Sequence, residues 1–394
     1  LDMGPTGKLL KPMGDLDFED AVALYAQVVK AGAAAGADLV LIETMSDSYE
    51  AKAAVLAAKE NCDLPVVVTT VYGENGKLLT GGTPASTVAL LEGLGVDALG
   101  VNCGLGPAQM LPVVKQLLEY ASVPLVVNPN AGLPHACDGC TVFDVGPAEF
   151  AVHMGTIADL GVQILGGCCG TTPDHIAAAV EVCRDKPFTP AADKGRTLVS
   201  SYAQAVEIGP APVVIGERIN PTGKKKFQQA LRDHNIEYLL NEAFAQEEAG
   251  AQVLDVNVGL PEIDEPALLV EVMESLQAVL PLPLQLDTSD PEAMERAMRR
   301  YNGKPMLNSV SGKAESMAAL FPLVKKYGGV VVGLALDENG IPPTAEGRLA
   351  IAKKICDTAA QYGIPRKEIV IDPLTLTISS EPEAAKVTLE AVGR

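Results

Sequence analysis

The sequence predicts an α/β protein built from two tandem (β/α)8 TIM barrels, the first lacking its N-terminal strands and the second its C-terminal strands. Short, continuously apolar segments alternate with helical segments along most of the 394 residues, which is typical of parallel strands buried on both faces. Polar side chains follow the apolar segments at their carboxyl ends. Barrel enzymes build their sites at this face, and this favours barrels over doubly wound sheets.

The first half of the chain contains five predicted strands. The turn-rich segment 2–8 is expected to be a loop. The strands are predicted over 37–43, 65–72, 98–103, 124–128 and 162–167, and the helices over 17–36, 48–61, 83–94, 106–121 and 147–160. The polar residues at the strand ends are Glu43, Thr69, Thr70, Asn102, Cys103, Asn128, Cys168 and Cys169.

The second half begins where the alternation of strands and helices weakens, between Asp185 and Pro212. We therefore predict a first domain over 1–199 and a second over 200–394. Six strands are predicted over 213–216, 252–257, 284–287, 306–308, 330–336 and 369–372. A fragment of a longer two-barrel chain would explain why neither half reaches eight strands.

The composition excludes several classes of partner. A formal net charge of −20 argues against binding to nucleic acid or to an anionic membrane surface, since both require a basic face. No apolar run is long enough to span a membrane, and no signal peptide is visible. We therefore expect a cytoplasmic protein with reduced thiols.

Three cysteines at predicted strand ends suggest a metal site. Cys168 and Cys169 are adjacent, and neighbouring cysteines do not easily form a disulfide with each other. Cys103 ends the predicted strand 98–103, which lies two strands before the strand that leads to Cys168. Alternate strand ends of a barrel lie within reach of one ion, so all three thiols can bind it. Three thiolates leave one position of tetrahedral zinc open for a substrate thiol. The alternative is that they are buried apolar cysteines.

The remaining cysteines are given smaller roles. Cys137 and Cys140 form a CxxC motif, which can be a zinc half-site or a redox pair. The sequence has no second CxxC and places this one in a predicted loop, so we expect an accessory or neutral role. His175 is expected to be a capping or surface residue, and the other cysteines are expected to be packing residues: Cys62, Cys183 and Cys356.

Both halves carry motifs of known families. The first half resembles the zinc-dependent homocysteine S-methyltransferases in Gly100–Gly104, Pro129–Pro134 and Gly166–Pro173. The second half is similar to the methyltetrahydrofolate-binding domain of cobalamin-dependent methionine synthase. The matching segments are Gly216–Gly223, Leu254–Gly259, Leu286–Thr288, Leu307–Ser311 and Ile371–Pro373.

The resemblance implies roles for individual residues. It implies zinc ligands at Cys103, Cys168 and Cys169, and contacts to the homocysteine amino acid group from Glu43 and Asn130. It implies that the pterin ring is bound by Asp287, Asn308 and Asp372, with Asp255, Asn257 and Asn220 lining the same mouth.

The chain also departs from the family pattern. The family's opening strand, with its acidic turn, is absent, and so are the last strands of the pterin domain. The cobalamin-binding module is also absent, so cobalamin would be held on a domain outside this chain.

The resemblance implies methyl transfer in methionine synthesis. Homocysteine would be activated as a zinc thiolate, and 5-methyltetrahydrofolate would supply the methyl group through cobalamin. Two alternatives are a corrinoid-dependent methyltransferase acting on another thiol or methyl donor, and a non-catalytic fragment that serves as a scaffold.

Overall fold

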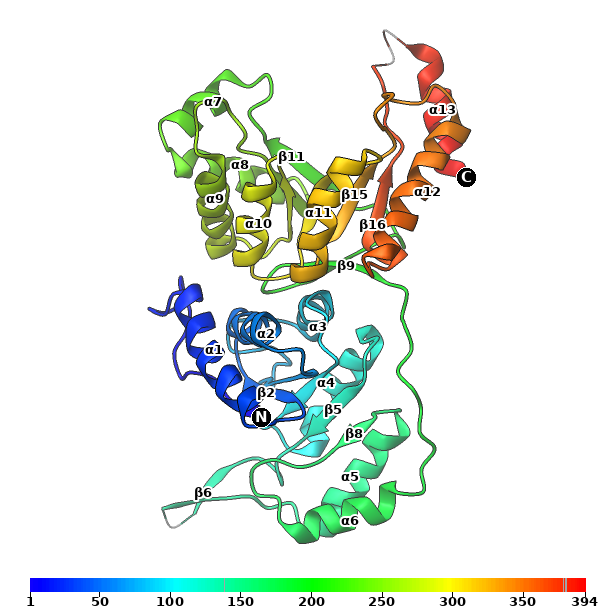
Figure 1. Cartoon of the computed structure of the whole chain (residues 1–394). Coiled ribbons are helices and arrows are strands. Elements are labelled where there is room, and N and C mark those ends of the chain that lie inside the picture. The colour runs from blue at the N-terminus through cyan, green and yellow to red at the C-terminus, as the bar shows by residue number, and fades with distance from the viewer. Residues whose placement is uncertain (138, 378, 380) are drawn as a thin grey trace. The chain divides into compact units, whose positions relative to one another are not determined.

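The computed structural model describes residues 1–137, 139–377, 379 and 381–394. The chain divides into two compact units (Figure 1). Unit 1 comprises Leu1–Gly195 with Tyr202–Ala205, and unit 2 comprises Arg196–Ser201 with Val206–Arg394. None of the helices within the described ranges combines the length and the apolar character that crossing a membrane requires.

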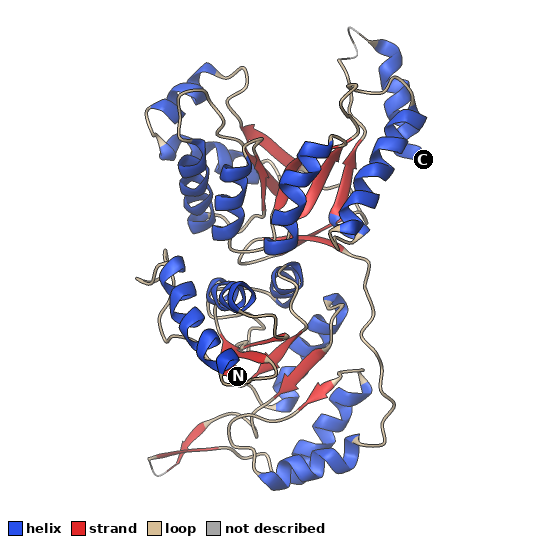
Figure 2. Ribbon diagram, viewed as in Figure 1, coloured by secondary structure: helices blue, strands red, loops and turns tan. Residues whose placement is uncertain are grey.

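Unit 1 is built on a six-stranded parallel sheet in the order β1-β2-β3-β4-β5-β8. Helices flank this sheet (Figure 2). Its strands are β1 (Asp2–Met3), β2 (Val40–Met45), β3 (Val66–Thr70), β4 (Ala98–Asn102), β5 (Leu125–Asn128) and β8 (Ile164–Leu165). Its helices are α1 (Phe18–Ala34), α2 (Ser48–Asn61), α3 (Pro84–Gly93), α4 (Pro107–Tyr120), α5 (Pro147–Asp159) and α6 (Pro173–Cys183).

Unit 2 repeats the pattern with a six-stranded parallel sheet in the order β11 to β16. Its strands are β11 (Ile215–Ile219), β12 (Val253–Val256), β13 (Leu284–Asp287), β14 (Met306–Ser311), β15 (Val330–Leu334) and β16 (Ile369–Asp372). Its helices are α7 (Lys225–Arg232), α8 (Ile236–Glu248), α9 (Glu265–Val279), α10 (Pro291–Arg300), α11 (Ala314–Tyr327), α12 (Ala345–Gln361) and α13 (Pro382–Gly393), with a short 3-10 turn, η1 (Arg366–Glu368).

The sequence of each unit explains its layered core. The strands are rich in β-branched residues, and Val40, Ile42, Val66 and Val68 are fully buried, as expected for strands covered on both faces. Each strand pairs with the next strand of its sheet in chain order, without the reversal that defines a doubly wound sheet. All carboxyl ends therefore meet at one edge of the sheet, where the sites are described below.

The predicted α/β class with parallel sheets in two domains is confirmed. Closed barrels are not confirmed, because among the described residues neither six-stranded sheet has its first and last strands paired. The chain carries six strands in each principal sheet, one more in unit 1 than the sequence indicated.

Three local expectations were wrong. The segment 2–8, expected to be a loop, begins with the strand β1, in which Met3 is buried. Two residues are too few to show the alternation of buried and exposed side chains that would reveal a strand in the sequence. The CxxC motif lies in a hairpin of β6 (His135–Cys137) and β7 (Cys140–Val142) and not in a loop. The strand expected over 162–167 is only the two-residue β8.

The irregular segment before the second sheet also contains structure. β9 (Thr197–Ser200) pairs with β10 (Ala205–Ile208) in a small two-stranded sheet. Val199 of β9 packs in one apolar cluster with Val253, Met306 and Val330. Ser200 exchanges backbone hydrogen bonds with Lys304. The segment therefore covers part of the core of unit 2.

Candidate active sites at the strand ends

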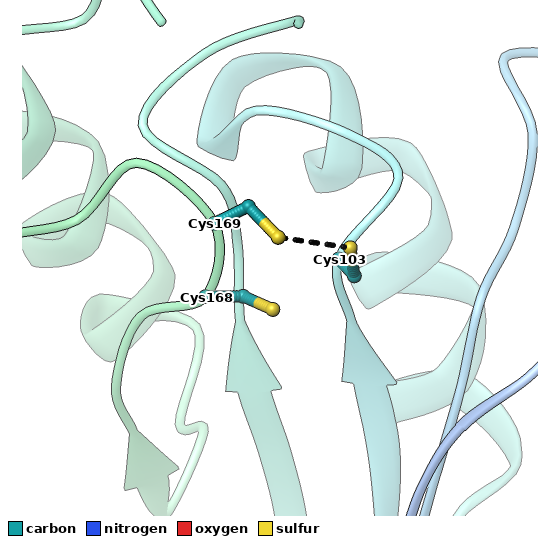
Figure 3. Close-up of side chains that lie close together, drawn as sticks. All are labelled: Cys103, Cys168 and Cys169. Carbon is teal, nitrogen blue, oxygen red and sulfur yellow. Dashed lines mark hydrogen bonds between the residues drawn. The ribbon is translucent and has the colours of Figure 1, made fainter. Parts of the chain in front are cut away.

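Cys103, Cys168 and Cys169 lie together at the carboxyl edge of the first sheet. Their three sulfurs are all within 4.8 Å of one another, and the Sγ atoms of Cys103 and Cys169 are 3.7 Å apart. Figure 3 shows the three side chains pointing toward a common centre. Cys103 follows β4 directly, and the other two follow β8, with β5 between these strands. The structure thus brings together the three cysteines that the sequence singled out.

The loop after β5 fixes both cysteines of the adjacent pair. The backbone N–H of Cys168 donates to the carbonyl of Pro129 at 2.9 Å. The N–H of Cys169 donates to Asn130 Oδ1 at 3.1 Å, and the carbonyl of Cys169 accepts from the N–H of Ala131 at 2.9 Å. These bonds fix the backbone from which the two sulfurs project.

Gly166 and Gly167, directly before the cysteines, let the backbone pass close to the side chains of Asn128 and Thr171. A Cβ on Gly166 would lie 2.5 Å from Asn128 Oδ1, and a Cβ on Gly167 would lie 2.7 Å from the side chain of Thr171. Both distances are shorter than contacts that side chains tolerate. A larger residue at either position would therefore have to displace the side chain of Asn128 or Thr171.

Asn102 is a buried support for the cluster that the sequence placed at a strand end without assigning it a role. Its Oδ1 accepts from the N–H of Thr44 at 2.9 Å and from Thr69 Oγ1 at 2.8 Å. Its Nδ2 donates to Thr44 Oγ1 at 2.7 Å and lies 3.9 Å from Cys168 Sγ. The network orients the carboxamide so that its donor faces the sulfur of Cys168.

The electrostatics of the cluster favour a bound cation. Burial, followed by the charge of Cys103, raises the pKa of the Cys168 thiol to about 12. Burial also raises the pKa of Cys169, and its neighbour Cys103 adds to the effect. Three thiolates this close need a compensating positive charge, and sulfur donors match a soft divalent ion such as zinc. The donor set therefore fits the metal that the sequence indicated.

The other residues predicted for the first site lie in different surroundings. Glu43 lies within β2, where burial and the nearby charge of Asp2 raise the pKa of its carboxyl. Asn130 is buried, and its side chain holds the backbone of Cys169. His175 is a cap, as expected, but it is buried and not on the surface. Its Nδ1 lies 2.9 Å from Thr172 Oγ1, and its Nε2 lies 2.9 Å from the carbonyl of Val145.

The second unit gathers four predicted pterin residues at its own carboxyl edge: Asp255, Asn257, Asp287 and Asn308, here called the Asp–Asn cluster. Asp287 and Asn308 are register partners on β13 and β14. Asn257 Nδ2 donates to Asp287 Oδ2 at 2.9 Å. Asp255 accepts hydrogen bonds from the carboxamides of Gln285 and Asn308. The cluster forms one connected set of donors and acceptors.

The pKa values of both acids in the Asp–Asn cluster are raised. Burial, then the charge of Asp287, raises the pKa of Asp255 to about 7, and the hydrogen bonds from the two carboxamides act in the opposite direction. Burial also raises the pKa of Asp287, while the bond from Asn257 lowers it and Glu217 raises it. Two acids in low-dielectric surroundings cannot both ionise cheaply.

The last two predicted pterin residues hold their own loops. Asp372 ends β16, and its Oδ1 accepts from the N–H of Leu374 at 2.8 Å. Asn220 follows β11, and its Oδ1 accepts from the N–H of Thr222 at 2.8 Å.

Asp287 does not cap helix α10, because Asp290 does so through the N–H groups of Glu292 and Ala293.

The sequence did not single out two glutamines that support this edge. Gln285 bonds Asp255 from the neighbouring strand. Gln246 of α8 is buried, and its Oε1 accepts from the N–H of Arg218 at 2.7 Å. Gln285 occupies an otherwise apolar strand segment, and that polar interruption was the available signal.

Comparisons with known proteins match this division of the chain. Residues 1–183 match the family model "Homocysteine S-methyltransferase", and residues 216–394 match "Pterin binding enzyme". The two matches lie one after the other along the chain. The three-cysteine cluster lies within the residues that match the first model, and the Asp–Asn cluster lies within those that match the second.

Two curated methionine synthases are similar to almost the whole of this chain. The methionine synthase of Mycobacterium leprae is 32% identical over 404 residues, which is 98% of this chain and 33% of that protein. The methionine synthase of Mycobacterium tuberculosis is 31% identical over 413 residues, 99% of this chain and 34% of that one. The chain thus spans about a third of the length of these relatives.

Among solved structures, the apo form of the homocysteine methyltransferase MmuM from Escherichia coli is 27% identical. The match covers 46% of this chain and 61% of that one, with a TM-score of 0.38.

Proposed function

We propose that this chain carries two of the sites of a cobalamin-dependent methionine synthase reaction. Unit 1 would bind and activate homocysteine, and unit 2 would bind 5-methyltetrahydrofolate. The observation that carries the proposal is the pairing of a three-sulfur cluster in one unit with an Asp–Asn cluster in the other, each at the carboxyl edge of its sheet. The two family matches and the methionine synthase relatives support it.

In unit 1 the proposed zinc ligands are Cys103, Cys168 and Cys169. A zinc ion held there would lower the pKa of an incoming thiol, so that homocysteine binds as a thiolate near neutral pH. The protein's own part is to hold the sulfurs in place, through Asn130 on the backbone of Cys169 and Asn102 beside Cys168. Such supports orient metal ligands and tune their basicity.

We assign the amino acid end of homocysteine to Glu43 and Asn130. The carboxylate of Glu43 can accept from an ammonium group, and the carboxamide of Asn130 offers both donor and acceptor. Burial raises the pKa of Glu43, so a bound ammonium ion would favour its ionised form.

In unit 2 the pterin ring is assigned to Asp287, Asn308 and Asp372, with Asp255, Asn257 and Asn220 around them. The aminopyrimidinone edge of a pterin presents donors and acceptors side by side, and carboxylate and carboxamide groups can satisfy them in pairs. Methyl transfer from N5 of the folate also requires a proton or hydrogen bond at that nitrogen. The raised pKa of Asp255, about 7, supplies a proton-holding group within the cluster.

Cobalamin would carry the methyl group between the two sites and would be held outside this chain. We further propose that each six-stranded sheet is part of the wall of a (β/α)8 barrel. The uninterrupted parallel order of the strands supports this assignment.

The proposal is tested with free methylcobalamin as methyl donor. The purified chain is loaded with zinc, and methionine formation from homocysteine is measured, with Cys168→Ala beside the wild type. We expect zinc-dependent methionine formation that the variant loses. In parallel, methyltetrahydrofolate is titrated into the chain by calorimetry. A zinc-loaded, folded chain that gives neither methionine nor folate binding would contradict the proposal.

A further inference from the structure

The CxxC hairpin is a second thiol feature of unit 1 that the proposed reaction does not use. Cys137 at the end of β6 and Cys140 at the start of β7 are register partners across an antiparallel ribbon. Both side chains are exposed, and both thiols are free. The hairpin projects away from the six-stranded sheet of its unit (Figure 1), so the two thiols are open to small molecules.

The register places the two thiols within reach of each other. Directly opposed residues of an antiparallel pair have Cα atoms about 4.5 to 5.5 Å apart and side chains on the same face. Disulfides span Cα separations of about 4.4 to 6.8 Å. Gly139, with φ of +79°, lies in the connection between the cysteines, and glycine adopts this backbone conformation without strain.

Two other roles fit the hairpin less well. A stable zinc site needs three or four protein ligands, and in the part of the chain that the structure describes only Cys103, Cys168 and Cys169 form a group of three donors within reach of one ion. A structural crosslink would contribute little, because the loop it closes is very short and the stabilisation from a disulfide grows with loop length.

We propose that Cys137 and Cys140 form a reversible dithiol–disulfide site, oxidised by low-molecular-weight disulfides and separate from the three-cysteine cluster. One cysteine thiolate attacks the small disulfide RSSR, forms a mixed disulfide and releases the first thiolate RS⁻. The second cysteine thiolate then attacks the mixed disulfide at the first cysteine's sulfur and releases the second RS⁻. The two cysteine sulfurs lose two electrons to RSSR, and the two thiol protons pass to solvent or to the released thiolates.

Exposure and a short connection favour this exchange. Accessible thiols react faster than buried ones, and exposed disulfides are reduced again more readily than structural ones. The second step is intramolecular, so it is faster than attack of a free thiol on the mixed disulfide.

The test uses the full zinc-loaded chain and glutathione as the probe. The chain is equilibrated in mixtures of reduced and oxidised glutathione, quenched in acid, alkylated and mapped by mass spectrometry. As the mixture becomes more oxidising, we expect the peptide that carries both cysteines to escape alkylation and to weigh about 2 Da less than its unalkylated dithiol form. Reduced glutathione should restore it. In Cys140→Ser the first step has no resolving thiol, so Cys137 should keep a glutathione adduct.

Cys183, a half-buried single cysteine of α6, is the internal control. It should gain at most a glutathione adduct under the same conditions. The proposal is overturned if wild-type Cys137 stops at the glutathione adduct, or if the hairpin thiols stay reduced in mixtures that already modify Cys183. Since the readout is mass, the result does not depend on methyl transfer.

Discussion

The two units place different chemistry on the same kind of scaffold. Unit 1 gathers three sulfurs, and the backbone that carries them is held by hydrogen bonds to the end of β5 and the loop after it. Unit 2 gathers carboxyl and carboxamide groups, which bond mainly to one another. In both, burial raises the pKa of the acidic groups. The first arrangement needs a cation to hold its thiols as thiolates, whereas the second can be completed by a neutral ligand that offers hydrogen bonds.

The largest effect that would separate the two sites is expected from Cys168→Ala. Removing one of three thiolates should reduce bound zinc from about one ion per chain to about a tenth or less after dialysis, because two ligands do not hold the ion. Metal analysis checks this, with Cys183→Ala as the matched control. Methyltetrahydrofolate binding should not change. Full zinc occupancy in Cys168→Ala would overturn the assignment of the metal site.

The complementary variant is Asn308→Ala. Asn308 bonds Asp255, and we propose that it also contacts the pterin ring, so its loss should weaken methyltetrahydrofolate binding roughly 10- to 100-fold. Calorimetric titration measures the change, and the exposed Asn339→Ala serves as control. Zinc content should stay at the wild-type level. Unchanged folate affinity would place the pterin ring elsewhere in unit 2.

A smaller effect is expected from the support of the sulfur cluster. Asn102→Ala removes the carboxamide donor beside Cys168 Sγ, and we expect about 10-fold weaker zinc affinity, as for other groups that orient metal ligands. Competition with a chelator gives the affinity. Thr69→Val removes only one hydrogen bond to Asn102 and should lower the zinc affinity less. If the two variants lower the zinc affinity equally, the contact between Asn102 and Cys168 does not contribute to zinc binding.

The last expected effect concerns pH. The pKa of Asp255 is raised from 3.8 to about 7 in the folded chain. Between these values the folded state keeps a proton that the unfolded state has lost, so stability falls as pH rises, by up to about 1.4 kcal/mol per pH unit.

Asp255→Asn should flatten this slope in urea unfolding followed by circular dichroism at pH 5 to 8. Asp290→Asn is the control, since asparagine caps a helix as well as aspartate does. An unchanged slope in Asp255→Asn would show that another group holds the proton.

Much of this arrangement followed from the sequence. Strands 284–287 and 369–372 were predicted with the bounds that the structure shows, because each is a short, mainly apolar segment that lies between helical segments and ends in aspartate. The meeting of Cys103 with Cys168 and Cys169 followed from their places at alternate strand ends.

The residues that support the sites could not be predicted in the same way. Asn102 contacts Thr44, 58 residues earlier in the chain, and no local pattern records a bond of that span. The two-residue strand β1 and the hairpin strands β6 and β7 are too short for a periodic signal. Their pairing comes from neighbours that only the fold supplies.

The loop that holds Cys169 has one more property. The N–H of Val145 donates to the carbonyl of Ala131 at 3.0 Å, so residues 132–144 leave and rejoin the fold at nearly the same point. Segments of this kind tolerate changes of length, because their ends are already joined. The hairpin is therefore a suitable place to insert a peptide tag or a fluorescent label, with Cys169 kept in position by bonds that lie outside the insertion.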